Sequence, residues 1–214
     1  MKLFSLPHSP YATRVRTLVR KAELDIEICS PPETPRTPEF VDHFPMGKMP
    51  VLELDDGSQL PDSWVIMRYL DEVACDSAYS PGGALARAHM ELLARYADTY
   101  LAPGGLFPLF KRVGQGADEG DAAEDIAALD AELARLDRVL TMLPSFADRP
   151  MHMGDMALVP HIDFVLMLAP MFGVNDPLAA HPRVAQGHAW TQVDSAVAES
   201  SAEMRAAVAA FFGA

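Results

Sequence analysis

The sequence predicts an α/β domain in the order βαβαββα over residues 1–76, followed by an all-α helical domain over residues 84–214. The first region alternates short apolar runs with helical spacing, whereas the second shows helical spacing alone. Between them, Ser80-Pro81-Gly82-Gly83 has the composition of a linker. Hydrophobic residues make up 50% of the 214 positions, which is enough to bury a core in each domain.

The elements of the first domain follow from apolar alternation and from turn residues. Strands are predicted at 2–6, 24–29, 51–54 and 58–60, and helices at 10–22, 38–44 and 62–74. Asp55-Asp56-Gly57 joins the last two strands as a hairpin, because aspartate and glycine favour tight turns. The opening strand, helix and strand predict a right-handed crossover between parallel strands.

The second domain is predicted to consist of helices. Their expected ranges are 84–101, 122–143, 154–169 and 182–198, with a last helix that ends in Phe211-Phe212. Segment 103–120 holds five glycines and two prolines and is predicted as a loop. Its apolar residues either line a pocket or pack beneath the neighbouring helices, and the sequence leaves both alternatives open.

The composition argues against several functional classes. A net charge of −13 and a pI near 4.8 disfavour a phosphate-backbone partner, so no nucleic acid is expected. No apolar run approaches the roughly 18 residues of a membrane span, so we expect a cytoplasmic protein without a membrane partner. Cys29 and Cys75 form no C-x-x-C pair, and the histidines lack metal-ligand spacing, so no metal is expected.

The stretch Lys48-Met49-Pro50-Val51, followed by Pro61-Asp62-Ser63, predicts a site for a small acidic peptide. Proline donates no ladder hydrogen bond, so Pro50 is expected at a strand start, where the Met49–Pro50 bond can be cis. The backbone of Met49 could then pair with an extended peptide. Asp62-Ser63 starts a helix whose free N–H groups suit a carboxylate. Each feature alone also fits an ordinary hairpin and helix.

This combination resembles the glutathione-binding half of the glutathione S-transferases, a thioredoxin-like domain, over residues 1 to about 75. The resemblance implies the glutathione S-transferase fold, glutathione as co-substrate and a homodimer. In that family the residue before the cis-proline pairs with the cysteinyl backbone of glutathione, and an acidic-Ser pair holds its γ-glutamyl end. The corresponding residues here are Met49, Pro50, Asp62 and Ser63. Lys48 is a candidate partner for the glycine carboxylate, or simply an exposed lysine.

The segment Ser9-Pro10-Tyr11-Ala12-Thr13-Arg14-Val15-Arg16 resembles the first helix of serine-type transferases, with a tau- or zeta-like motif. The resemblance implies that Ser9 is the catalytic serine, which donates a hydrogen bond to the glutathione thiolate. From the residues alone, Ser9 is a helix N-cap with proline at the first helical position. Ser5 and Thr13 are alternative hydroxyl donors. Arg14 and Arg16 either support a contact between domains or face solvent, and neither is assigned to the site.

The resemblance also implies a second substrate, a small hydrophobic electrophile, bound between the domains. Candidate pocket residues are Tyr11, Tyr100, Phe107 and Phe110, although aromatic residues near long helices are often core. The expected activity is conjugation of glutathione, as in detoxification. The alternatives are a zeta-type glutathione-dependent isomerase and a non-catalytic binding or regulatory protein of the same fold, similar to stringent-starvation proteins.

Met151-His152-Met153-Gly154-Asp155-Met156 resembles the start of a buried C-terminal helix in the same family. Asp155 occupies the third position after the cap, as in a capping box. His152 stands where the family has serine or threonine.

Overall fold

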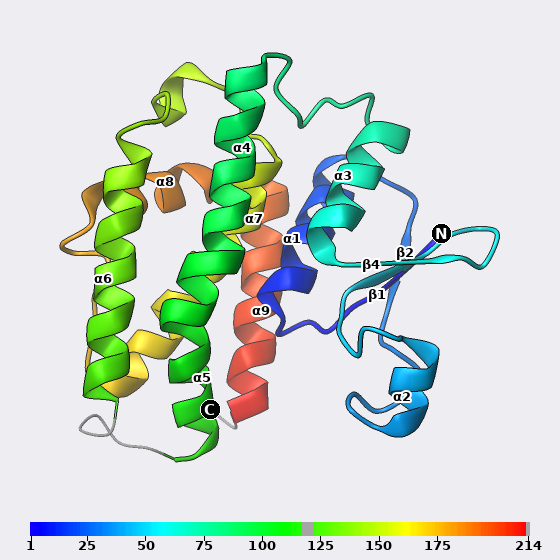
Figure 1. Ribbon diagram of the computed structural model, residues 1–214, viewed down its shortest axis with the longest axis horizontal. Helices are drawn as coiled ribbons and strands as arrows, with labels where there is room; N and C mark the ends of the chain where they lie inside the picture. The colour runs from blue at the N-terminus through cyan, green and yellow to red at the C-terminus, as the bar shows by residue number, and fades with distance from the viewer. Residues whose placement is uncertain (117–121, 213–214) are drawn as a thin grey trace. The chain divides into compact units, whose positions relative to one another are not determined.

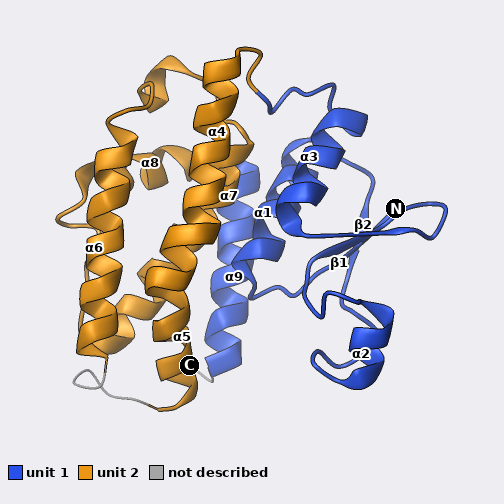
Figure 2. Cartoon of the chain, in the orientation of Figure 1, with its two compact units in different colours: residues 1–80, 195–214 blue, residues 81–194 orange. Residues whose placement is uncertain are grey.

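The computed structural model describes residues 1–116 and 122–212 (Figure 1). The chain divides into two compact units, one made of residues 1–80 with 195–214 and the other of residues 81–194 (Figure 2). The first unit therefore contains the last helix, α9 (Ser195–Phe212), which the sequence placed with the helical domain. Helix α9 belongs to the first unit because it packs against α1 (Pro10–Lys21), which is part of the same unit.

The first unit contains a four-stranded mixed sheet in the order β2-β1-β3-β4. Its strands are β1 (Lys2–Phe4), β2 (Glu27–Cys29), β3 (Val51–Glu53) and β4 (Gln59–Pro61). β1 runs parallel to β2 and antiparallel to β3. With helices α1, α2 (Pro38–His43) and α3 (Ser63–Ala74), this is the predicted thioredoxin-like order βαβαββα. Pro61 lies in the edge strand β4, where a missing N–H is tolerated.

Each face of the sheet carries its own buried cluster, because successive side chains of a strand point to opposite faces. Leu3 pairs with Leu52, and both are fully buried. Phe4 and Val51, one position along, belong to a cluster with Phe40, Phe44 and Met49. The segment around Met49 is thus anchored by the side chain of Met49 in the core.

The second unit is helical, as predicted, but its boundaries differ from the expected ones. The described elements are α4 (Ala84–Tyr96), a π-helical segment η1 (Ala97–Leu106), α5 (Phe107–Gly114), α6 (Ala123–Leu140), α7 (Met153–Leu168), short 3₁₀ turns η2 (Phe146–Asp148) and η3 (Ala169–Phe172), and α8 (Pro182–Thr191). The helix predicted at 182–198 ends at Thr191, and a turn at 192–194 separates it from α9.

The prediction of a loop at 103–120 is wrong for residues 103–114, because η1 and α5 are helical there. Pro108 lies in the first turn of α5, which continues directly from η1, and Pro103 lies inside η1. Gly105 is needed for close packing, since a Cβ there would lie 2.7 Å from Cδ1 of Leu129 on α6. Glycine and proline therefore serve helix packing here instead of a loop. Residues 117–120 of the predicted loop lie outside the described residues.

Helix α7 forms the centre of the second unit. The stretch Met153–Phe172 is long and apolar enough to cross a membrane, yet 72% of its most apolar window is buried inside the protein. Its apolar surface is therefore used for packing. At Gly154, an added Cβ would collide with the carbonyl oxygen of Met90, so α4 and α7 approach closely there.

The start of α7 carries the expected acidic half of a capping box. The backbone N–H of His152 donates to Oδ2 of Asp155 at 3.0 Å. Arg149 binds both carboxylate oxygens of Asp155, at 2.6 and 2.7 Å, and its guanidinium lies over the ring of Trp190. Because Asp155 is only 3% exposed, this ion pair neutralises a carboxylate buried in the core.

His152 should make the stability of the protein depend on pH. Burial lowers the pKa of His152, an effect that the nearby carboxylate of Asp155 only partly offsets. The unfolded chain then binds more protons as the pH falls below about 6.5, the ordinary histidine pKa, so folding is weakened by acid. We expect the melting temperature of His152→Ser, relative to wild type, to be higher at pH 5.5 than at pH 8. A change in melting temperature that is equal at both pH values would contradict this coupling.

Candidate functional site

Ser9 lies at the start of α1, directly after the segment that leaves β1. Its Oγ accepts the backbone N–H of Ala12 at 3.3 Å, and Pro10 follows it in the first turn. Ser9 is therefore the N-cap of α1, as its residue type predicts. The capping bond uses a lone pair of the hydroxyl and leaves the O–H proton to donate to another group. Ser9 is half-buried.

The two alternative hydroxyls are already engaged within the core. Ser5 Oγ accepts a bond from Nη1 of Arg16 at 2.7 Å. Thr13 Oγ1 donates to the carbonyl of Ser9 at 2.8 Å and accepts from Nη2 of Arg16 at 2.8 Å. Both residues are buried. Of the three hydroxyls, that of Ser9 is the better suited to a ligand.

The Met49–Pro50 bond is cis. Met49 is 8% exposed, and its side chain packs in the cluster below the sheet. Within residues 1–116 and 122–212, no hydrogen bond engages the backbone N–H or C=O of Met49. An extended peptide could use both groups, because a donor and an acceptor on one residue form a pair of strand-like bonds.

Asp62 caps α3 from a backbone conformation that is uncommon for a residue with a side chain. Its φ is 75°, and its Oδ1 accepts the N–H groups of Trp64 and Val65 at 2.9 and 3.1 Å. Such a conformation costs about 1 to 3 kcal/mol. The next N–H, that of Ser63, has no hydrogen-bond partner in the part of the chain that the structure describes. It is available for an anion at the helix start.

Ser63 is 3% exposed, and its side chain is hydrogen-bonded to Arg14. Its Oγ accepts from Nε of Arg14 at 2.9 Å and from Nη2 at 2.6 Å. Two accepted bonds occupy both lone pairs, so the hydroxyl proton of Ser63 is directed toward a further acceptor. The same guanidinium lies 5.0 Å from the ring centre of Tyr11. Arg14 thus links α1 to the start of α3.

Arg14 is the residue that the sequence interpretation missed. It is 1% exposed, although an arginine on a helix usually reaches solvent. One signal was available: Arg14 precedes the buried Leu18 by four positions and so lies on the same side of the helix. That spacing indicated burial, but it did not identify Ser63 as the partner.

The other candidate residues are not brought together by a described contact. Lys48 is exposed, and its role toward a glycine carboxylate stays a prediction. Tyr11 belongs to the first unit, whereas Tyr100, Phe107 and Phe110 belong to the second. Tyr100 is 47% exposed and Phe107 43% exposed, while Phe110 packs against Phe164 with ring centres 5.6 Å apart. The electrophile pocket therefore also stays a prediction.

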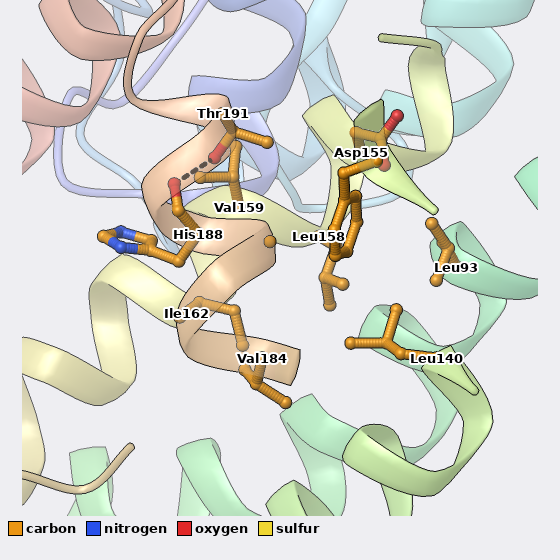
Figure 3. Close-up of a pocket in the computed structure, with 11 residues that line it drawn as sticks. Leu93, Leu140, Asp155, Leu158, Val159, Ile162, Val184, His188 and Thr191 are labelled. Atoms are coloured by element: carbon orange, nitrogen blue, oxygen red, sulfur yellow. Dashed lines mark hydrogen bonds between the residues drawn. The ribbon is translucent and has the colours of Figure 1, made fainter. Parts of the chain in front are cut away.

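A small cavity in the second unit does not qualify as a substrate site. Residues of α4, α6, η2, α7 and α8 line it, and most of them are apolar, such as Leu158, Ile162 and Val184 (Figure 3). Its volume of about 20 Å³ holds roughly one water molecule. Among the described residues, no group of three His, Cys, Asp or Glu side chains could hold a metal ion. Burial raises the pKa of both Cys29 and Cys75, which disfavours a reactive thiolate.

Known proteins share the fold of this chain. Residues 8–73 match the family model described as glutathione S-transferase, N-terminal domain. No curated protein matches the sequence. Among solved structures, a glutathione S-transferase from Methylobacillus flagellatus with glutathione bound is 23% identical, with a TM-score of 0.73, and the match covers 93% of this chain and 98% of that one.

Two further solved structures give the same result. A Gtt2-class glutathione S-transferase of Vibrio parahaemolyticus is 23% identical, with a TM-score of 0.74 and coverage of 96% and 99% of the two chains. A glutathione transferase family member from Pseudomonas fluorescens with bound glutathione is 21% identical, with a TM-score of 0.73 and coverage of 93% and 97%. At these identities the structures establish the fold, which is that of the glutathione S-transferases.

Proposed function

We propose that this chain is a glutathione transferase, which holds glutathione as a thiolate and directs it to a small hydrophobic electrophile. The observation that carries the proposal is the set of unused hydrogen-bonding groups on Ser9, Met49 and Ser63. All three residues lie in the thioredoxin-like unit and within the segment 8–73 that matches the family's N-terminal domain. Ser9 offers a hydroxyl, Met49 offers its backbone N–H and C=O, and Ser63 offers the N–H at a helix start. One extended tripeptide could bind all of these groups.

Each part of glutathione has a proposed partner. The backbone of its cysteine pairs with the N–H and C=O of Met49, next to Pro50. The carboxylate of its γ-glutamyl end accepts bonds from the N–H and Oγ of Ser63, at the helix start that Asp62 caps. Lys48 attracts the glycine carboxylate. In this arrangement the hydroxyl of Ser9 donates a hydrogen bond to the sulfur of glutathione.

One hydroxyl can supply most of the free energy needed to lower the pKa of the glutathione thiol. Lowering the pKa of a thiol by two units from about 8.5 requires roughly 2.7 kcal/mol of preferential stabilisation of the anion. A hydrogen bond to a charged acceptor contributes about 1.5 to 3 kcal/mol. The N-terminus of α1 adds about 0.3 to 1 kcal/mol. Ser9 acts as a donor only: the thiol proton leaves to solvent, and the sulfur then forms a bond to the electrophilic carbon while that carbon's leaving group departs with its electron pair or the π electrons of an activated double bond move to the far atom.

The remaining parts of the proposal rest on the resemblance. Tyr11, Tyr100, Phe107 and Phe110 are proposed to contact the electrophile, whose apolar character their rings would suit. A homodimer in the cytoplasm and a role in detoxification are proposed on the same ground. Isomerisation of a glutathione adduct, as in the zeta type, would use the same thiolate.

Calorimetric titration with glutathione tests the proposal directly. We expect saturable binding of one glutathione per chain, together with thiolate absorbance near neutral pH. S-methylglutathione, which cannot ionise at sulfur, should bind without this absorbance. Failure of glutathione to bind at millimolar concentration would exclude the proposal and favour a non-catalytic binding protein of this fold.

Arg14 gives a prediction about recognition of the γ-glutamyl carboxylate. Arg14→Lys keeps a positive charge but loses the two-nitrogen fork that holds Ser63. We expect the dissociation constant of glutathione to rise about fivefold, equivalent to about 1 kcal/mol. A glutathione analogue without the γ-glutamyl α-carboxylate provides the control, because it should bind both proteins equally. An equal loss of affinity for both ligands would assign Arg14 a general structural role.

A further inference from the structure

Arg16 holds the segment between β1 and α1 in place. It is 1% exposed, and all five of its N–H groups have an acceptor. Nη1 donates to Ser5 Oγ at 2.7 Å and to the Leu6 carbonyl at 3.2 Å. Nη2 donates to the Pro7 carbonyl at 2.8 Å and to Thr13 Oγ1 at 2.8 Å. A single buried side chain therefore binds Ser5, Leu6 and Pro7, the segment that leads to Ser9.

Thr13 extends these contacts to Ser9 itself. Its hydroxyl accepts from Arg16 and donates to the Ser9 carbonyl, each at 2.8 Å. Ser9 lies outside the strand: the backbone of this segment is tied to β2 by the bond from the Ser5 N–H to the Cys29 carbonyl at 2.9 Å, and the Ser9 N–H donates to the Leu6 carbonyl at 3.1 Å. Arg16, Thr13 and the Ser9 carbonyl therefore form one continuous chain of hydrogen bonds.

The remaining N–H of Arg16 points to the C-terminal helix. Nε donates to Oε2 of Glu203 at 3.2 Å, across 187 positions in the sequence. The same oxygen accepts from Nη2 of Arg20 at 2.6 Å. Glu199, one turn earlier on α9, contacts Arg20 at 3.1 Å. Glu203 contacts both Arg16 and Arg20, whereas Glu199 forms its ion pair with Arg20.

The end of α9 makes a second contact with the same segment. Phe211 stacks on the ring of His8, with ring centres 4.9 Å apart. His8 immediately precedes Ser9 in the chain. Helix α9 therefore meets the segment both through Arg16 and directly at His8.

We propose that Glu203 is a positioning residue for Ser9, acting from the C-terminal helix through Arg16 and Thr13. The inference rests on the proposed function, in which the hydroxyl of Ser9 must meet the glutathione sulfur. A guanidinium excluded from water requires an anion beside it. Without the charge of Glu203, Arg16 shifts toward other acceptors or solvent and loosens its hold on the carbonyls of Leu6 and Pro7. Small displacements of a catalytic group can cost a large part of the rate.

The experiment compares Glu203→Gln with Glu199→Gln, which removes a similar charge one helical turn away. We expect Glu203→Gln to move the titration of the bound glutathione thiol to higher pH and to lower kcat about tenfold, with the KM for glutathione within about twofold of wild type. Glu199→Gln should match the wild type in all three measurements. A shift of the titration that is equal in both variants would overturn the inference, since charge alone would then explain it.

Two further variants separate positioning from general destabilisation. In a Ser9→Ala background, Glu203→Gln should produce no additional shift, because its effect passes through Ser9. Thr13→Val, which keeps the shape of the side chain but breaks the bond to the Ser9 carbonyl, should reproduce the shift even if Glu203→Gln fails to fold. An unchanged titration in Thr13→Val, or a further shift in the Ser9→Ala background, would contradict the proposal.

The wild-type protein distinguishes this inference from the proposed function. If wild type shows no thiolate absorbance with glutathione, the proposed function fails and the inference fails with it. If wild type shows the absorbance and Glu203→Gln leaves it unchanged, only the inference fails.

Discussion

Ser9→Ala is expected to remove most of the thiolate absorbance of bound glutathione at neutral pH. The lost hydrogen bond to a charged sulfur is worth about 1.5 to 3 kcal/mol, so kcat/KM should fall by about tenfold to a hundredfold. The affinity for glutathione should change little, because Met49 and Ser63 would still bind its backbone and its γ-glutamyl end. Absorbance, calorimetry and steady-state kinetics on the two proteins measure these effects separately.

The capping role of Ser9 requires its own control. Ser9→Ala also removes the bond to Ala12, which should cost about 1 kcal/mol of stability. Thr37 caps α2 with a bond of the same length, 3.3 Å, from the N–H of Phe40. Thr37→Ala should therefore cost similar stability and leave the thiolate absorbance intact. An equal loss of absorbance in both variants would show that helix capping, and not the Ser9 hydroxyl, supports the thiolate.

Asp155→Ala is expected to destabilise the protein strongly. It would leave Arg149, which is 12% exposed, without the carboxylate that now binds it at two atoms. It would also free the backbone N–H of His152 at the start of α7. Removing one partner of a buried ion pair costs about 3 to 5 kcal/mol, so the melting temperature should fall by about 10 °C. Thermal unfolding followed by circular dichroism measures this change.

The control for Asp155 is a more exposed ion pair in the same unit. Asp125 on α6 binds Nε of Arg112 at 2.8 Å, and both side chains are partly exposed, at 21% and 38%. Asp125→Ala should cost at most about 1 kcal/mol, because solvent screens such a pair. Similar melting temperatures for Asp155→Ala and Asp125→Ala would mean that the Arg149 pair adds no special stability.

Local signals predicted most of the first unit correctly. The order of strands and helices, the cap at Ser9 and the proline at the start of β3 depend on residues a few positions apart, and the structure has them. The same rules failed at 103–114, where glycine and proline suggested a loop. Gly105 is required there by Leu129 on α6, which lies more than twenty positions along the chain, and a local rule cannot include that residue.

The sequence by itself determined the fold class and the residues that form the ends of helices and strands, because backbone preferences act over one or two turns. Only the tertiary structure decided which side chains are buried together. Arg14 and Arg16 look like solvent-facing arginines in the sequence, yet they bind Ser63 and Glu203, 49 and 187 positions away. The partner of a long side chain depends on how distant segments pack, and α1 brings both partners to the segment that carries Ser9.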